Sequence, residues 1–189
     1  MSRNKISAGI FAFLIAASAA SAASAASADD EGGKISFTGA VVDAPCVVAQ
    51  DSTDLTVDLG QTTVAYIDAN GFTEPVEIKI NLTNCLLTGT GEGGADITKA
   101  SVTFSSTSTD TTDIDLLANT NSSGAAGVGV RLLTEDDTKI KLNDAVDVTL
   151  QPTSSEQTLM FHAQMENVES VTTTPGAVEA NATYTIAYL

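Results

Sequence analysis

With 189 residues, the chain is long enough to form one domain with a substantial core, and its net charge of −16 makes it strongly acidic. This charge would repel a phosphate backbone, so we exclude nucleic acid as a partner. The acidic side chains near residues 110–115 and 135–137 do not follow the spacing of a calcium-binding loop. We therefore expect neither a metal nor a cofactor.

The first 28 residues are predicted to be an export signal. Arg3 and Lys5 precede an apolar stretch at residues 6–20, and an Ala/Ser-rich tail follows. The strongly apolar part is too short for a spanning helix, and no later segment is apolar enough for one, so we expect no membrane insertion. We predict cleavage after Ala28, where small residues suit the signal peptidase.

Residues 29–45 form an N-terminal extension whose second half alternates in character. Ile35, Phe37, Gly39 and Val41 fall on one side of an extended chain, and polar or small residues fall on the other. Such alternation is typical of a β-strand with one apolar face. From composition alone, this segment is either the first strand of its own domain or a strand that pairs with another molecule.

Cys46 and Cys85 are the two cysteines of the chain. An exported protein meets oxidising conditions, so we expect them to form a disulfide. Closing a loop of this length stabilises the fold by about 4 kcal/mol in the chain-entropy model. A metal site is the weaker alternative, because the chain has one histidine, His162, and no paired-cysteine motif.

The remainder, residues 46–189, has the pattern of an all-β domain. Short segments of alternating or β-branched apolar residues recur between loops rich in Thr, Ser, Asn, Asp and Gly. No convincing amphipathic helix is present, although residues 114–118 could hold a short helical turn. Many short strands without intervening helices indicate an immunoglobulin-like β-sandwich. The predicted strands are residues 55–59, 76–82, 101–104, 127–133, 146–150, 159–165 and 182–188.

No catalytic constellation is found in the sequence. His162 falls opposite the apolar residues of its predicted strand, so we expect it to face solvent rather than to act as a general base. The sequence has no Gly-x-Ser-x-Gly motif, and both cysteines are accounted for by the predicted disulfide. The glycine-rich run at residues 89–94 lacks the ending of a phosphate-binding loop. We expect no enzymatic activity.

Both ends of the mature chain resemble a known family. Residues 33–46 closely resemble the mature N-terminus of chaperone-usher pilins, particularly the major subunits of type 1-like fimbriae. That family ends in a strand with a penultimate tyrosine and carries a glycine fourteenth from the C-terminus, and here Tyr188 and Gly176 occupy these positions. The resemblance also covers residues 59–61, 84–85 and 180–189, so it runs over essentially the whole mature chain.

The resemblance implies an incomplete immunoglobulin-like β-sandwich that is completed by donor-strand exchange. In the family, a periplasmic chaperone fills an open groove during export, and at the outer-membrane usher the N-terminal extension of the next subunit replaces it. Donor and acceptor surfaces differ, so the product is a head-to-tail polymer of the chain with itself. The implied location is a fimbrium, reached through the periplasm and displayed at the cell surface.

The same resemblance assigns roles to individual residues. Phe37 and Val41, with Ile35 on the same face, would enter the acceptor groove, and Gly39 would lie where the groove is too shallow for a side chain. The carboxylate of Leu189 would bind basic residues of the chaperone. The residues implied at the groove edge and in chaperone recognition are Gly176, Tyr184, Ile186, Tyr188 and Leu189.

Two other functions stay open from the sequence. One is a minor pilin of the same fold, acting as an adaptor or at the tip. The other is a monomeric periplasmic binding module whose N-terminal strand pairs internally. Purification separates them, because a shaft subunit forms denaturant-resistant ladders, a minor pilin a single capped species, and a binding module a stable monomer.

Overall fold

A computed structural model describes residues 34–189 of the chain. It separates into two units, Met1–Ala40 and Val41–Leu189, which we describe individually. The predicted export signal and its cleavage after Ala28 lie outside the described residues. The predicted boundary between extension and domain at residue 46 stays a prediction.

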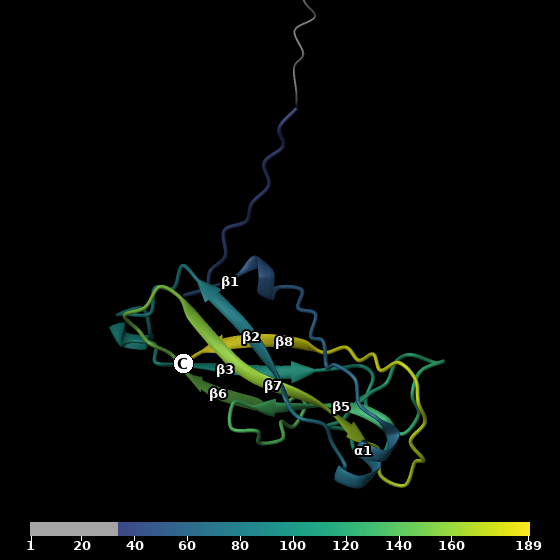
Figure 1. Cartoon of the computed structure of the whole chain (residues 1–189). Helices are drawn as coiled ribbons and strands as arrows, with labels where there is room; N and C mark the ends of the chain where they lie inside the picture. Colours follow the sequence, from purple (N-terminus) through teal and green to yellow (C-terminus); the bar gives the residue numbers. More distant parts are fainter. Residues whose placement is uncertain (1–33) are drawn as a thin grey trace, which may run out of the picture. The chain divides into compact units, whose positions relative to one another are not determined.

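Two antiparallel sheets make up the second unit (Figure 1). The five-stranded sheet has the order β1 (Val47–Val48), β2 (Val76–Thr83), β7 (Gln157–Asn167), β5 (Val128–Thr134), β4 (Leu117–Ala118). The three-stranded sheet has the order β6 (Ala145–Thr149), β3 (Lys99–Ser105), β8 (Thr183–Tyr188). The helical elements are η1 (Gln50–Ser52), α1 (Val64–Asn70) and η2 (Glu92–Gly94). The all-β sandwich prediction is confirmed.

The core lies between the two sheets and follows from the alternation within their strands. In β2, Ile78, Ile80 and Leu82 are buried, while the residues between them are at least partly exposed. Phe104 of β3 meets Phe161 of β7 edge to face, with ring centroids 4.9 Å apart. Full burial of each such side chain contributes about 1.5–3 kcal/mol.

Most predicted strands overlap an observed strand, but the one at residues 55–59 is wrong. No strand is formed in this segment, although its apolar residues do alternate. Val57 and Leu59 pack against the core, yet no neighbouring strand of the described chain pairs with the segment. The alternation therefore correctly predicted which side chains pack against the core. It could not predict that the segment has no neighbouring strand to pair with in the described chain.

The helix α1 was not expected from the sequence, in which no convincing capped helix was found. Its N-terminus is capped by the Thr63 hydroxyl, which accepts a hydrogen bond from the Tyr66 N–H at 3.1 Å. It ends at Gly71, whose φ of 83° lies in the left-handed region. Because only Ile67 of this short helix is buried, no periodicity was detectable; the two caps were the available signal.

The helical turn suggested at residues 114–118 is also wrong in its second half. Leu117 and Ala118 form β4, in which Leu117 pairs with Val130 of β5. Two strand-forming residues are too few to show an alternation in the sequence.

The predicted disulfide between Cys46 and Cys85 is confirmed. It joins the residue before β1 to the chain just after β2, which are themselves paired through Val47 and Thr83. The bond therefore fixes the beginning of the sandwich against its second strand.

Candidate strand-binding groove

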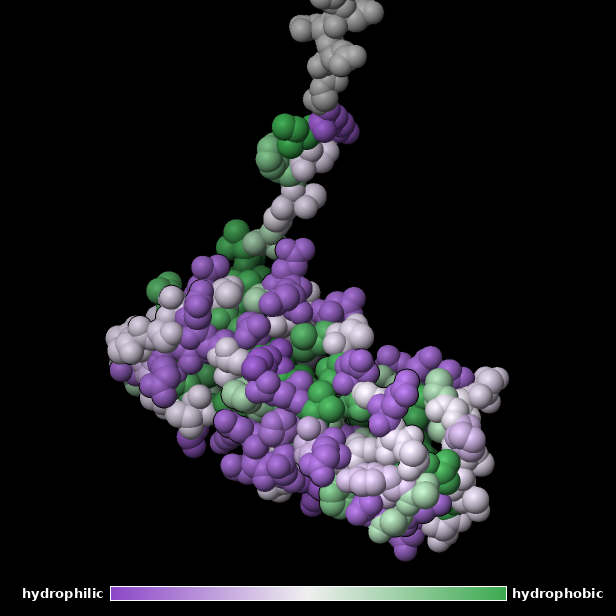
Figure 2. Space-filling view, in the orientation of Figure 1, coloured by the Kyte–Doolittle hydropathy of each residue, from purple (hydrophilic) through white to green (hydrophobic). Residues whose placement is uncertain are grey.

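A groove with a volume of about 1310 Å³ runs along the domain between two chain segments, residues 53–64 and 173–184. Figure 2 shows apolar surface within a hollow that is bounded by polar surface. Protein interiors are normally packed without empty spaces of this size. Its floor consists of apolar side chains from several strands, among them Ile78, Ile80, Phe104, Leu117, Val130, Leu132, Ala163 and Met165.

The first wall, residues 53–64, has its main chain largely free. Val57 and Leu59 are half-buried against the core, so their side chains hold the segment in place. Within the described chain, the main-chain groups of residues 54–59 make no hydrogen bonds. A wall of this kind leaves polar main-chain groups available beside an apolar floor.

The second wall, residues 176–182, has its main chain bonded on one side. The carbonyl oxygen of Ala177 accepts from the Ala125 N–H at 2.9 Å, and that of Glu179 from the Thr120 N–H at 2.7 Å. For the alternate residues Val178 and Ala180, we find no main-chain partner between residues 34 and 189. Their side chains pack against the core. The main-chain groups on one edge of this wall are thus hydrogen-bonded, and those on the other edge have no partner among the described residues.

Gly176 lies where the second wall touches a neighbouring loop. A Cβ atom at this position would overlap the main chain of Gly124 and Ala125. The reverse also holds, because a Cβ atom at Gly124 would overlap the carbonyl oxygen of Ala177. Gly176 was singled out from the sequence, whereas Gly124 was not, and only the tertiary contact shows that both must be glycine.

The strand β8 continues the second wall as the edge of the three-stranded sheet. Tyr184, Ile186 and Tyr188 are half-buried, and the residues between them are exposed, so the three share a face as predicted. Of these, Tyr184 lines the groove, whereas Ile186 and Tyr188 pack against the core without lining it.

The end of β8 fixes the position of the chain terminus. The Tyr184 hydroxyl donates a hydrogen bond to the Ser52 carbonyl. Burial raises the pKa of the Tyr184 hydroxyl and of the Tyr188 hydroxyl. The exposed Leu189 is held through its main chain, since its N–H donates to the Lys99 carbonyl at 2.9 Å. The chain end therefore lies beside the start of β3.

The predicted donor residues are exposed in this structure. The exposed fractions of Ile35, Phe37 and Val41 are 75%, 89% and 103%. No other atom comes within 4 Å of the place a Cβ would occupy at Gly39. Residues 34–46 contain no strand. Three exposed apolar side chains thus lie in a segment with strand-like alternation.

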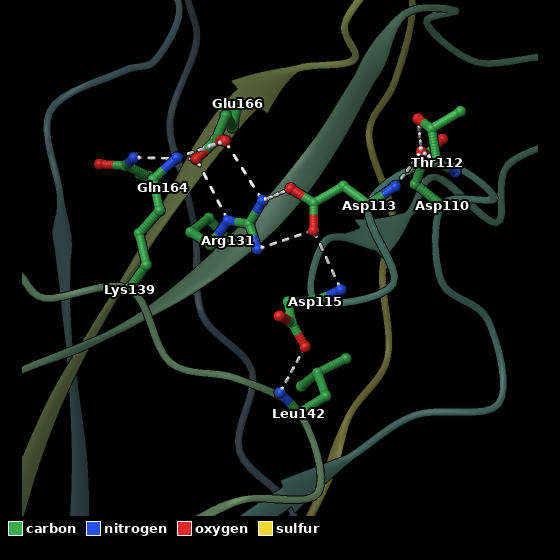
Figure 3. A network of polar contacts seen from close by, with 9 residues as sticks. All are labelled: Asp110, Thr112, Asp113, Asp115, Arg131, Lys139, Leu142, Gln164 and Glu166. Carbon is green, nitrogen blue, oxygen red and sulfur yellow. Dashed lines mark hydrogen bonds and ion pairs between the residues drawn. The ribbon is translucent and has the colours of Figure 1, made fainter.

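The opposite face of the five-stranded sheet carries a cluster of charged side chains instead of a groove (Figure 3). Arg131 of β5 is only 2% exposed and lies between Glu166 and Asp113, which both accept hydrogen bonds from its guanidinium. The Lys139 ammonium lies 2.7 Å from the Glu166 carboxylate. The cluster joins the loops that carry Asp113 and Lys139 to strands β5 and β7.

The charges in this cluster neutralise one another. Burial alone would raise the pKa of Glu166, but hydrogen bonds from Arg131 and Lys139 outweigh it and lower that pKa. The hydrogen bond from Arg131 likewise lowers the pKa of Asp113. The cluster was missed in the sequence, where the signal was a single arginine inside the apolar run at residues 128–133. Its chemistry is that of a structural ion cluster.

His162 lies on this outer face too, on the side predicted for it. Its side chain is only 21% exposed, less than expected, and its Nδ1 lies 2.6 Å from the Asp137 carboxylate. In the described part of the chain, no group of three or more histidine, cysteine or acidic side chains is suited to a metal ion. Nor does any helix among residues 34–189 have the length and apolar character needed to cross a membrane.

Comparison with known proteins agrees with this geometry. Residues 35–189 match the family model described as "Fimbrial protein". The uncharacterized fimbrial-like protein YbgD of Escherichia coli K12 is 41% identical over 177 residues, which cover 92% of this chain and 94% of that protein. Long polar fimbria protein A of Salmonella typhimurium is 31% identical over 179 residues, covering 93% and 94% respectively.

A solved structure shares the fold. A chain in the structure of a chaperone-usher pilus superimposes with a TM-score of 0.69 at 24% identity, covering 85% of this chain and 97% of that one. The architecture is thus an immunoglobulin-like β-sandwich. With the match of the family model over most of its length, the chain belongs to the fimbrial protein family, the pilins of chaperone-usher pili.

Proposed function

We propose that the chain is a structural subunit of a pilus shaft, in which residues 35–41 of one molecule fill the groove of the next. The observation that supports this most strongly is the apolar groove, whose walls have open main-chain edges. A strand that adds to such an edge gains main-chain hydrogen bonds and places alternate side chains on the floor. Membership of the fimbrial family supports the same function.

The dimensions of donor and groove agree. Extended chain rises about 3.3 Å per residue, so residues 35–41 span about 20 Å, and the second wall with the start of β8, from Gly176 to Tyr184, spans about 26 Å. The wall is therefore long enough for the whole donor. Ile35, Phe37 and Val41 would face the apolar floor, and Gly39 would pass the shallowest point.

The energetics favour a persistent polymer. Burying three large apolar side chains contributes about 5–8 kcal/mol before entropic costs. Each net main-chain hydrogen bond adds about 1 kcal/mol. Because dissociation would expose both the donor and the groove, the contact is expected to be kinetically stable.

The partners that we propose are a periplasmic chaperone and an outer-membrane usher. An uncovered apolar edge would aggregate, so a periplasmic chaperone protects the groove until the usher exchanges it for the next donor. Leu189, exposed at the chain end, leaves its carboxylate accessible to basic residues of that chaperone. We propose export through the periplasm and display in a fimbrium, with no catalytic role for the subunit.

Electron microscopy of cells that express the chain with a matching chaperone and usher tests this function. We expect filaments from the native chain and none from Gly39→Trp or from a deletion of residues 29–42, while chaperone binding persists in both. Ser36→Trp, on the other face of the donor, is the matched control and should still assemble. Normal filaments from either donor variant would show that the donor assignment is wrong.

Denaturing gels separate the remaining functions. Ladders that resist mild denaturant support a shaft subunit. A single capped species would instead indicate a minor pilin, and a stable monomer without chaperone would indicate an internally completed binding module.

A further inference from the structure

We propose that Asn119 is a positioning residue that holds the second groove wall in the conformation a donor strand requires. This inference rests on the proposed function, because it concerns the same groove. Asn119 follows β4 and lies beside the wall rather than within it.

The side chain of Asn119 uses its full hydrogen-bonding capacity. Its Nδ2 donates to the carbonyl oxygens of Ala125 at 2.8 Å and Ala177 at 2.9 Å. Its Oδ1 accepts from the main-chain N–H groups of Asn121 at 3.1 Å and Glu179 at 3.0 Å. An amide has two N–H donors and an oxygen with two lone pairs, so each is occupied.

These bonds connect a loop to two alternate residues of the wall. Ala177 and Glu179 belong to the wall, whereas Ala125 and Asn121 belong to the loop at residues 119–125. The wall between Gly176 and Thr183 is not a strand of either sheet, so no ladder fixes it. A single side chain therefore supplies part of the restraint that a neighbouring strand would normally give.

The orientation of the open edge follows from this restraint. In an extended chain, the main-chain groups of successive residues point to opposite sides. With Ala177 and Glu179 turned toward the loop, Val178 and Ala180 present their N–H and C=O groups to the groove. If the wall were shifted by one residue, the main-chain groups of Ala177 and Glu179 would face the groove instead of those of Val178 and Ala180. The Glu179 side chain would then point to the apolar floor.

The contact between loop and wall is an independent observation that points the same way. At Gly176 and Gly124, the two main chains approach so closely that neither position accommodates a Cβ. The close approach brings the wall within reach of the short Asn119 side chain.

The test is binding of a donor peptide to the exported full-length chain. The chain is refolded with excess synthetic peptide of residues 34–45, and the peptide release rate is measured together with hydrogen exchange of the Val178 and Ala180 amides. The variants are Asn119→Ala and Asn119→Asp. Asp keeps the acceptor oxygen but loses both donors.

We expect release to be about tenfold faster in both variants, with protection lost at residues 178 and 180. Asn121→Ala is the matched control. The side-chain Nδ2 of Asn121 donates to the Glu179 carboxylate at 3.1 Å and contacts no main-chain group of the wall. Its release rate should stay within about twofold of the native chain.

The outcomes are distinct. Unchanged release and protection in both Asn119 variants would overturn the inference and leave the proposed function intact. Equal loss of protection at Ile80 and Phe161 would also overturn it, because that pattern indicates general destabilisation. If Asn119→Ala does not refold, Asn119→Asp alone decides. Failure of the native chain to bind the peptide would overturn the proposed function and this inference together.

Discussion

The two faces of the five-stranded sheet differ in chemistry, since one lines an apolar groove and the other carries a cluster of paired charges. The inner face ends in an apolar groove, and main-chain groups of its walls have no partner among residues 34–189. The outer face buries Arg131 under two loops and pairs it with Glu166 and Asp113. The charged groups of the outer face are paired within the described chain, so they serve stability, whereas the inner face is the one that we propose binds a donor strand. Substitutions on the two faces should therefore affect different measurements.

The largest effect is expected on the outer face, from Arg131→Met. Removing the guanidinium leaves the Glu166 carboxylate buried without its main partner, which costs about 3–5 kcal/mol of unfolding free energy. Urea unfolding of the peptide-completed subunit measures this. Lys139→Met, which removes an exposed charge from the same carboxylate, is the control and should cost about 1 kcal/mol or less. Equal effects of the two substitutions would contradict the role of Arg131.

The disulfide should contribute nearly as much. Replacing both Cys46 and Cys85 by serine releases a loop with a sequence separation of 39 residues and should lower the unfolding free energy by about 4 kcal/mol. Unfolding of the native chain with and without reductant gives an independent value. A loss below about 1 kcal/mol would show that the unbridged chain is already restrained there.

On the inner face, Gly176→Ala should weaken donor binding more than it affects the rest of the sandwich. The new Cβ would overlap the main chain at Gly124 and displace the wall, at a cost of about 1–3 kcal/mol. Peptide release rates measure the effect. Gly93→Ala also adds a methyl group, but at a position outside the groove with open space for a Cβ and a φ of 67° that disfavours a side chain, so it is the control for destabilisation that leaves the wall untouched. If the release rate were unchanged in Gly176→Ala, the contact between Gly176 and Gly124 would not contribute to donor binding.

The smallest effect is a pH dependence that belongs to the outer face. The pKa values of Asp113 and Glu166 are lowered in the folded chain, so their stabilisation is present above the unfolded carboxyl pKa of about 4. It is lost as the pH falls through the lower folded values. Unfolding free energy should decrease over this range, and less steeply in Glu166→Gln. An unchanged slope in that variant would exclude Glu166 as a source of the dependence.

Two segments with similar alternation show the limit of the pattern. β2 and residues 55–59 both carry apolar residues at every second position, but only β2 lies between other strands, β1 and β7. Alternation reports which face is buried and contains no information about whether a partner strand is present. The helix α1 and the strand β4 escaped prediction because each is too short to show a period.

The sequence by itself determined the class of fold, the disulfide, the family and the alternating residues of the extension and of β8, because these depend on local pattern and on motifs at the chain ends. Only the tertiary structure decided that Arg131 is neutralised by Glu166 and Asp113, that Gly124 and Gly176 touch, and that Asn119 binds the groove wall. These contacts join residues far apart in the chain, and their energies depend on distances that no local pattern encodes.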